Sequence, residues 1–370
     1  MRILYFSETY SVHDHRFLSS LASTQHEVYF VRLLEDKIDM APISGLKNIH
    51  IAESLGLTRE QTFFDLLKAA KSLKPILHRI QPDLVHAGPL QNCAFVASIA
   101  SNIPLLAMSW GFDLMDIIER KWIWKLTTIF ALNKAAYYTS DAQATQHRAF
   151  QLGAKKNRAS LIPWGVDCER FSPQPRETAV GQGQLFTLFC NRSWEPTYGV
   201  DIFAKAFCKV ASTRSDVRLM LLGSGSMEEK IKGILSDGKV LDKVLFPGRI
   251  SQEELPNYYR KADLYISPSH VDGSSVSLME ALACGLPVLV SDIPGNLPWV
   301  QEKMNGWSFH DDEEDMLANK ILNAIAERES LHEMGENARQ LALEKANWKI
   351  NFQALLQTYE DTLSAEKRDN

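Results

Sequence analysis

Cysteine is scarce in this sequence, and the cysteines present show no pairing pattern. The five cysteines are spread from Cys93 to Cys284, without a C-x-x-C motif or neighbouring histidines. A zinc site, a redox pair and a disulfide framework are therefore not expected. A reducing compartment such as the cytoplasm fits this composition.

Long apolar runs and concentrated basic charge are absent as well. No apolar run reaches the roughly 18 residues that a membrane-spanning helix needs, and the sequence opens on a strand pattern rather than a signal peptide. We therefore expect a protein that is neither secreted nor integral to a membrane. The formal net charge is −5, with Lys and Arg spread along the chain. Without a basic stripe, no nucleic-acid partner is expected.

What is present is the composition of an ordinary globular protein. Apolar residues make up 45% of the 370 residues and charged residues 23%. A chain of this length is too long for one compact core, so two domains are expected.

Short, uniformly apolar runs alternate with helical stretches along the chain. The expected strands are 2–6, 27–31, 104–108, 185–190, 217–222, 264–267 and 287–291. Such alternation predicts βαβ units on parallel sheets. Uniformly apolar strands indicate sheets with helices on both faces. The predicted fold class is α/β, with two Rossmann-like domains.

A stretch without periodicity, 171–184 (FSPQPRETAVGQGQ), lies near the middle of the chain and is expected to link the domains. It divides an N-terminal domain over 1–175 from a C-terminal domain over 176–346. A helix over 347–365 follows. Its apolar stripe consists of Trp348, Phe352, Leu355, Leu356, Tyr359 and Leu363.

The most informative segment, 262–296, reads as strand, Gly/Ser-rich turn, helix and strand. The turn at 272–275 (DGSS) precedes the helix, so free backbone N–H groups and the helix dipole favour an anion there. Glu280, two turns into the helix, could offer its carboxylate to vicinal hydroxyls such as those of a ribose. Together these features predict a site for a nucleotide diphosphate.

This segment, D-G-S-S-V-S-L-M-E-A-L-A-C-G-L-P-V, resembles the donor-binding motif of the family 4 glycosyltransferases. The resemblance implies that Asp272 contacts the donor sugar and that Glu280 binds the ribose. The turn amides that would contact sugar and phosphate are those of Gly273, Ser274, Ser275 and Val276. Asp272 replaces the usual Glu and Ser274–Ser275 the usual Phe-Gly, so the donor sugar stays open.

Further segments fit the same family in its order. They are 162–173 (IPWGVDCERFSP), 221–225 (LLGSG) and 246–250 (FPGRI), the last placing Arg249 beside the nucleobase. After the strand at 185–190 the family has an Arg and then Lys-Gly. Here Arg192 is present, but Tyr198 stands where the Lys would be. The resemblance therefore leaves Arg192 as the cation on the diphosphate.

Polar residues after the first strand replace the family's Gly-Gly loop. Loops at the carboxyl ends of parallel strands face the ligand crevice, so His13, Asp14, His15 and Arg16 could meet acceptor or phosphate. The alternative is a polar surface without a ligand.

Two more loops of the N-terminal half are expected on the acceptor side. Gly88 follows one expected strand, and 109–113 (SWGFD) follows another. The latter resembles a family His-Gly-x-Asp, with Trp110 in place of the His. An indole donates one hydrogen bond but takes no proton, so no base is expected there. Asp113 matches the family's catalytic-site Asp, and the alternative is that it caps the next turn.

The segment 119–130 (ERKWIWKLTTIF) mixes basic with large apolar residues. This composition suits an interfacial helix touching anionic lipid at the inner face of a membrane. A helix packed on the N-terminal sheet, with its basic ends in water, is the alternative.

The resemblance as a whole implies a GT-B fold with the domains facing across a cleft, the last helix crossing back to the first domain, and retaining hexosyl transfer. The acceptor would be a glycan or lipid-linked glycan of polysaccharide or lipopolysaccharide-type biosynthesis. No metal and no cofactor besides the nucleotide sugar are expected, because no DxD motif stands out from the acidic run 311–315. A sugar-nucleotide epimerase and a non-catalytic nucleotide-sugar binder are the rival functions.

Overall fold

The computed structural model describes residues 1–35, 47–118, 121–174, 185–248 and 250–369. The chain forms two compact units. The first comprises residues 1–162 and those from 352 onward, and the second comprises residues 163–351.

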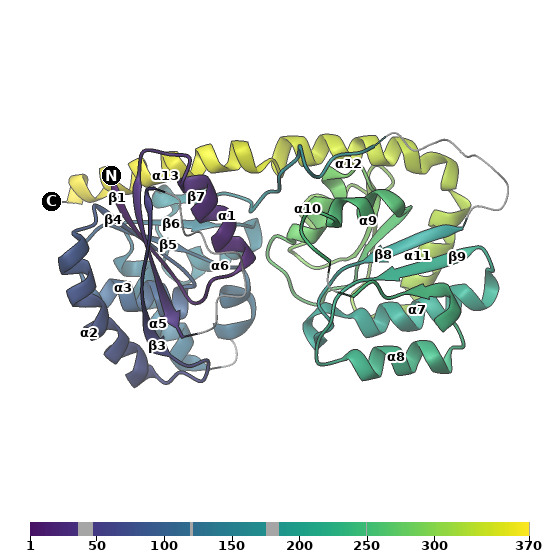
Figure 1. Cartoon of the computed structure of the whole chain (residues 1–370), viewed down its shortest axis with the longest axis horizontal. Coiled ribbons are helices and arrows are strands. Elements are labelled where there is room, and N and C mark those ends of the chain that lie inside the picture. Colours follow the sequence, from purple (N-terminus) through teal and green to yellow (C-terminus); the bar gives the residue numbers. More distant parts are fainter. Residues whose placement is uncertain (36–46, 119–120, 175–184, 249, 370) are drawn as a thin grey trace. The chain divides into compact units, whose positions relative to one another are not determined.

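The first unit is built on a parallel sheet with strand order β3-β2-β1-β4-β5-β6-β7 (Figure 1). Its strands are β1 (Arg2–Ser7), β2 (Glu27–Leu34), β3 (Ile49–Leu57), β4 (Leu84–Ala87), β5 (Leu105–Met108), β6 (Tyr137–Ser140) and β7 (Ala159–Leu161). Its α-helices are α1 (Val12–Leu21), α2 (Phe63–Ile80), α3 (Phe95–Ala100), α5 (Trp122–Lys134) and α6 (Gln143–Gln151). Shorter helical turns are η1 (Leu90–Ala94), η2 (Asp113–Ile117) and η3 (Lys156–Arg158).

The second unit repeats this architecture with strand order β10-β9-β8-β11-β12-β13. Its strands are β8 (Phe186–Cys190), β9 (Val217–Leu221), β10 (Val244–Leu245), β11 (Leu264–Ser267), β12 (Val288–Ser291) and β13 (Gly306–Phe309). Its α-helices are α7 (Val200–Thr213), α8 (Glu228–Asp237), α9 (Leu255–Lys261), α10 (Val276–Ala283), α11 (Glu314–Ala326) and α12 (Leu331–Lys345). Shorter turns are η4 (Pro196–Tyr198), η5 (Leu241–Lys243), η6 (Leu297–Trp299) and η7 (Arg328–Ser330).

Burial explains why these runs become strands. Every residue of β8, β11 and β12 is buried, as expected for a parallel sheet covered on both faces. In the second unit α7 and α8 lie on one face of the sheet, and α9 and α10 lie on the other (Figure 1). Each strand that the sequence predicted is present within one or two residues or as a longer strand.

The last helix, α13 (Trp348–Asp369), belongs to the first unit from Phe352 onward. Tyr359 is fully buried, and its hydroxyl lies 2.9 Å from Nδ1 of the buried His86 on β4. Thr358 donates a hydrogen bond of 2.9 Å to Ser160 on β7. The part of the predicted apolar stripe from Phe352 onward therefore belongs to the first unit, whereas Trp348 belongs to the second.

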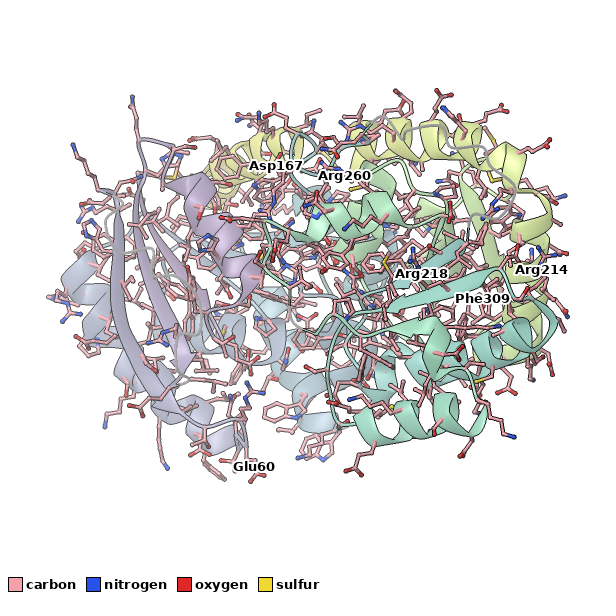
Figure 2. The ribbon with its side chains drawn as sticks, turned by 45° about the vertical axis from the view of Figure 1, so that its right-hand side comes forward. Glu60, Asp167, Arg214, Arg218, Arg260 and Phe309 are labelled. Atoms are coloured by element: carbon pink, nitrogen blue, oxygen red, sulfur yellow. The ribbon has the colours of Figure 1, made fainter. Side chains whose placement is uncertain are left out.

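The division between the units lies after Ile162, earlier than the expected boundary after residue 175. The start of the predicted linker and the residues just before it pack within the second unit. Arg260 (labelled in Figure 2) donates to the carbonyl oxygens of Arg170 and Ser172. Arg339 donates to those of Cys168 and Phe171. Residues 175–184 of the predicted linker lie outside the described residues.

The described residues contain neither a membrane-spanning helix nor a disulfide. Among them no helix is long and apolar enough to cross a bilayer. All five cysteines are described, and none forms a disulfide.

Candidate functional site

The second sheet reverses its strand order between β8 and β11, which lie side by side at its centre. Ligands of open α/β sheets bind beyond the carboxyl ends of strands at such a switch point. The loop after β8 (191–199) and the loop after β11 (268–275) both begin there. The sequence-predicted residues Arg192 and Asp272 lie on these two loops.

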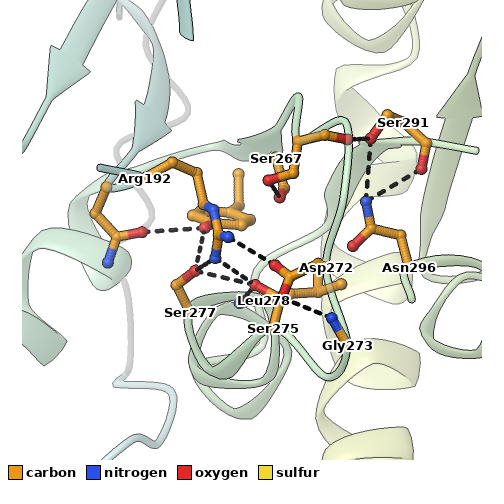
Figure 3. Close-up of polar contacts among 12 residues, drawn as sticks. Arg192, Ser267, Asp272, Gly273, Ser275, Ser277, Leu278, Ser291 and Asn296 are labelled. Carbon is orange, nitrogen blue, oxygen red and sulfur yellow. Dashed lines mark hydrogen bonds and ion pairs between the residues drawn. The ribbon is translucent and has the colours of Figure 1, made fainter. Parts of the chain in front are cut away.

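Arg192 is held by the loop and helix opposite it (Figure 3). Its Nη2 lies 2.6 Å from Oδ2 of Asp272, and its Nη1 donates to the hydroxyls of Ser275 at 2.8 Å and Ser277 at 3.0 Å. The side chains of Arg192 and Asp272 are only 11% and 17% exposed. Burial by itself lowers the pKa of Arg192, but the Asp272 carboxylate raises it above its usual value, so the guanidinium stays charged.

The guanidinium of Arg192 lies over the ring of Tyr198. The guanidinium carbon lies 4.3 Å from the ring centroid, which is a cation–π contact. Gly199 follows in a left-handed conformation (φ +58°), and a Cβ there would lie 2.1 Å from the carbonyl oxygen of Pro268. Only glycine lets the two loops approach this closely. Nε of Arg192 is buried and has no acceptor among the described residues.

The predicted turn directly precedes α10, whose N-cap is Ser275. Gly273 donates its N–H to Oδ1 of Asp272 at 2.9 Å, and Ser275 caps α10 by accepting from the N–H of Leu278 at 3.4 Å. Ser274 and Ser275 are buried, and Val276 is partly buried. The N-terminus of α10 thus adds its dipole to the charge of Arg192.

Glu280 lies on α10 and is 6% exposed. Its Oε2 accepts a hydrogen bond of 2.8 Å from the hydroxyl of Tyr259 on α9. The predicted contact of Glu280 with ribose stays a prediction. Arg249, predicted beside the nucleobase, lies outside the described residues.

Several polar residues around this site were not identified from the sequence. They are Asn191, Tyr259, Tyr265, Ser277 and His270. His270 pairs with Asp311, 2.7 Å from Nδ1 to Oδ1. Asp315, in the same acidic run, lies 2.6 Å from Lys209. In the part of the chain that the structure describes, no three His, Cys, Asp or Glu side chains are grouped to hold a metal.

The predicted acceptor-side residues of the first unit gather at the start of α1. His13 contacts Arg16 at 2.9 Å, and its ring packs edge-on to Trp110 at 5.9 Å between centroids. Burial, together with the Arg16 charge, lowers the pKa of His13 to about 3. His15 lies 2.7 Å from the hydroxyl of Tyr10. Gly88 is required by close packing, since a Cβ there would lie 2.5 Å from the carbonyl oxygen of Met108.

Asp14 and Asp113, both predicted at the ligand crevice, are fully buried. Asp14 accepts from Ser11 and Tyr5 and forms the capping box of α1.

Asp113 accepts from the hydroxyl of Ser109 at 2.7 Å. It also accepts from the N–H groups of Leu90, Trp110 and Leu114. These four bonds occupy its lone pairs. The structure therefore favours the capping alternative for Asp113 over a catalytic contact.

Comparison with known proteins covers both units. The family described as glycosyl transferases group 1 matches residues 173–341, and the family described as glycosyl transferase 4-like matches residues 2–142.

Two curated relatives match about half of the chain. GDP-mannose-dependent alpha-(1-6)-phosphatidylinositol monomannoside mannosyltransferase of Mycolicibacterium smegmatis is 27% identical over 200 residues, 51% of this chain and 52% of the relative. Lipopolysaccharide 1,2-N-acetylglucosaminetransferase of Salmonella typhimurium is 26% identical over 204 residues, 51% of this chain and 53% of the relative. The chain thus spans about half the length of the curated relatives it matches.

Solved structures match over nearly the whole chain. Sucrose-phosphate synthase from Thermosynechococcus elongatus gives a TM-score of 0.82 at 18% identity, covering 99% of this chain and 100% of that one. Anabaena HepE in complex with UDP-glucose gives 0.77 at 18%, covering 97% and 99%. This likeness confirms the predicted GT-B fold. Because glycosyltransferase families match both units of that fold, the chain belongs to the group 1 glycosyltransferases of family 4.

Proposed function

We propose that this chain is a retaining glycosyltransferase that moves a hexose-type sugar from a nucleotide diphosphate to a glycan or lipid-linked acceptor. The pathway would be polysaccharide or lipopolysaccharide-type biosynthesis at the cytoplasmic side of a membrane. Family membership supports the reaction class. The named relatives act in glycolipid and lipopolysaccharide assembly, which supports the acceptor class.

The observation that carries the proposal is the buried guanidinium of Arg192 next to the N-terminus of α10 at the switch point of the second sheet. Two sources of positive potential converge where two phosphates would lie. The unsatisfied Nε–H of Arg192 is a further donor for a phosphate oxygen.

In the proposed reaction the bond between the anomeric carbon and the β-phosphate oxygen breaks, and a bond to the acceptor oxygen forms. The acceptor's proton passes to an oxygen of the leaving diphosphate, so no side-chain base or nucleophile is required. Negative charge grows on the β-phosphate as the bond breaks, and a fixed guanidinium stabilises it most in the transition state. Arg192 would supply this stabilisation without a metal or cofactor.

Transfer from labelled donors tests the proposal. A panel of UDP-, GDP- and ADP-hexoses would first be screened for thermal stabilisation of the protein, and the best donor then incubated with lipid-linked glycans. We expect labelled product with retained anomeric configuration. Interconversion of free nucleotide sugars would instead indicate an epimerase, and binding without turnover a non-catalytic binder.

We further propose that α5 contacts anionic lipid. Trp122, Leu126 and Phe130 are 72%, 51% and 41% exposed and follow one another at a spacing of four residues, on one side of the helix. Lys121 and Lys125 are exposed beside them. The opposite side of α5 is buried, so both sequence interpretations apply to this helix.

Vesicle co-sedimentation tests the lipid contact. Trp124 packs against the core and is unsuited as a probe. Trp122→Ser should reduce binding to anionic vesicles, while Leu241→Ser, an exposed apolar site in the second unit, should not. Equal sedimentation of both variants would rule out the contact.

A further inference from the structure

A continuous chain of hydrogen-bonded side chains connects Arg192 to Glu280, the two charged residues of the donor site. Its members in order are Arg192, Ser277, Tyr265, Asn191, Tyr259 and Glu280. The five distances are 3.0, 2.9, 3.0, 2.8 and 2.8 Å.

These hydrogen bonds link secondary-structure elements that are distant in sequence. Tyr265 lies on β11, Tyr259 on α9, and Ser277 on α10, while Asn191 directly follows β8. Tyr259 and Tyr265 are both fully buried. Burial raises the pKa of each phenol well above its usual value, so both keep the proton that they donate.

The end groups fix the direction of these bonds. A carboxylate only accepts, so the single proton of Tyr259 goes to Glu280, and the Nδ2 of Asn191 donates to Tyr259. The Oδ1 of Asn191 then accepts the proton of Tyr265. Ser277 receives a bond from the guanidinium at one side. The hydroxyl of Tyr265 also lies 2.9 Å from that of Ser277, and hydrogen bonds joined in one network strengthen one another.

We propose that Asn191, Tyr259 and Tyr265 are positioning residues that couple the diphosphate end of the donor site to its ribose end. This inference rests on the proposed function. A nucleotide that binds Glu280 competes with the hydroxyl of Tyr259 for the Glu280 carboxylate. The linked hydrogen bonds transmit this change to Ser277, which holds Arg192. Binding energy gained on the non-reacting ribose would thereby help to fix the cation at the reacting phosphate.

A double-mutant cycle measures this coupling. The dissociation constant of a nucleoside diphosphate, chosen from UDP, GDP and ADP as the tightest binder, would be measured calorimetrically for four proteins. These are the wild type, Arg192→Lys, Glu280→Gln and the double variant. The same four would then be measured in a Tyr265→Phe background.

In the unmodified background we expect the double variant to deviate from the product of the single losses by about three- to tenfold, as interacting residues of one network do. In the Tyr265→Phe background the losses should multiply independently. Tyr259→Phe is a second variant that interrupts the hydrogen-bonded series, and it is used if Tyr265→Phe lowers the melting temperature. Tyr258→Phe is the matched control. It removes a phenol hydroxyl from α9, the helix of Tyr259, but this hydroxyl is not part of the hydrogen-bonded series.

The outcomes separate this inference from the function on which it rests. A wild-type protein that binds no nucleoside diphosphate would overturn both. Binding with independent losses in the unmodified background, or with the same deviation in both backgrounds, would overturn the coupling alone. A merely structural role would change stability without removing the deviation.

Discussion

Replacing Arg192 by alanine is the sharpest test of how the site works. The guanidinium is charged and buried, and it is held within 3.0 Å by Asp272, Ser275 and Ser277. Charge on the leaving phosphate rises as the glycosidic bond breaks, so the loss of this cation should lower kcat rather than raise the donor KM.

The expected magnitude follows from comparable electrostatic stabilisers. Removal of one preorganised donor to a developing oxyanion costs ~3 kcal/mol, or on the order of a hundredfold in rate. Arg192→Ala also leaves the carboxylate of Asp272 without the partner at 2.6 Å, and such an unpaired carboxylate adds a separate penalty. Comparing the double variant Arg192→Ala/Asp272→Asn with Asp272→Asn alone removes that penalty and isolates the lost cation.

Steady-state kinetics with the identified donor give kcat and KM for each variant, and circular dichroism reports on folding. Arg214→Ala is the control, because Arg214 forms an ion pair with Asp216 through exposed side chains (Figure 2). It should keep wild-type kcat. Near wild-type turnover by folded Arg192→Ala would refute the assignment.

Three further predictions concern donor affinity, pH and metals. Glu280→Gln should raise the donor KM about tenfold with little change in kcat, because ribose hydroxyls carry the same charge throughout transfer; a fall in kcat alone would contradict this. Burial lowers the pKa of His86 to about 3, against about 6.5 in the unfolded chain, so stability is retained above pH 6.5 and lost as the pH falls toward 3. Relative to His86→Gln, the wild type should lose about 2 kcal/mol between pH 7 and pH 5 in urea unfolding, and parallel pH profiles would disprove it. Chelation with EDTA should leave the transfer rate unchanged, and strict dependence on Mg²⁺ or Mn²⁺ would count against Arg192 as the phosphate cation.

The sequence predicted those parts of the fold that depend on local pattern. Buried parallel strands produce uniform apolar runs, and the strands found from them are β1, β2, β5, β8, β9, β11 and β12. The short outer strands β7 and β10 were not predicted. β10 has two residues and β7 has three, so neither gives a readable period. The unit boundary was placed too late, because Arg260 and Arg339 hold the segment before the linker and no local pattern shows it.

In the candidate site, too, the residues of a local motif were predicted and those joined by distant contacts were not. The turn at 272–275 and Glu280 were found because one continuous βαβ motif contains them. Asn191 and Tyr259 were missed because their hydrogen bond joins residues 68 positions apart. For Asp113 the sequence left two alternatives open, because a carboxylate at a strand end has the same local pattern whether it faces a ligand or caps a buried turn.

Two departures from the family pattern, Tyr198 and Asp272, both contact the guanidinium of Arg192. Tyr198 replaces a Lys, which removes one positive charge, and its ring instead packs against the remaining guanidinium. Asp272, shorter by one methylene than the usual Glu, forms an ion pair with that guanidinium. The cation is thus paired with a neighbouring carboxylate. In the proposed function a diphosphate would compete with Asp272 for Nη2 of Arg192, so part of its electrostatic attraction would be offset by the pair that it displaces. In the proposed function the N-terminal dipole of α10 adds to the attraction for the phosphates.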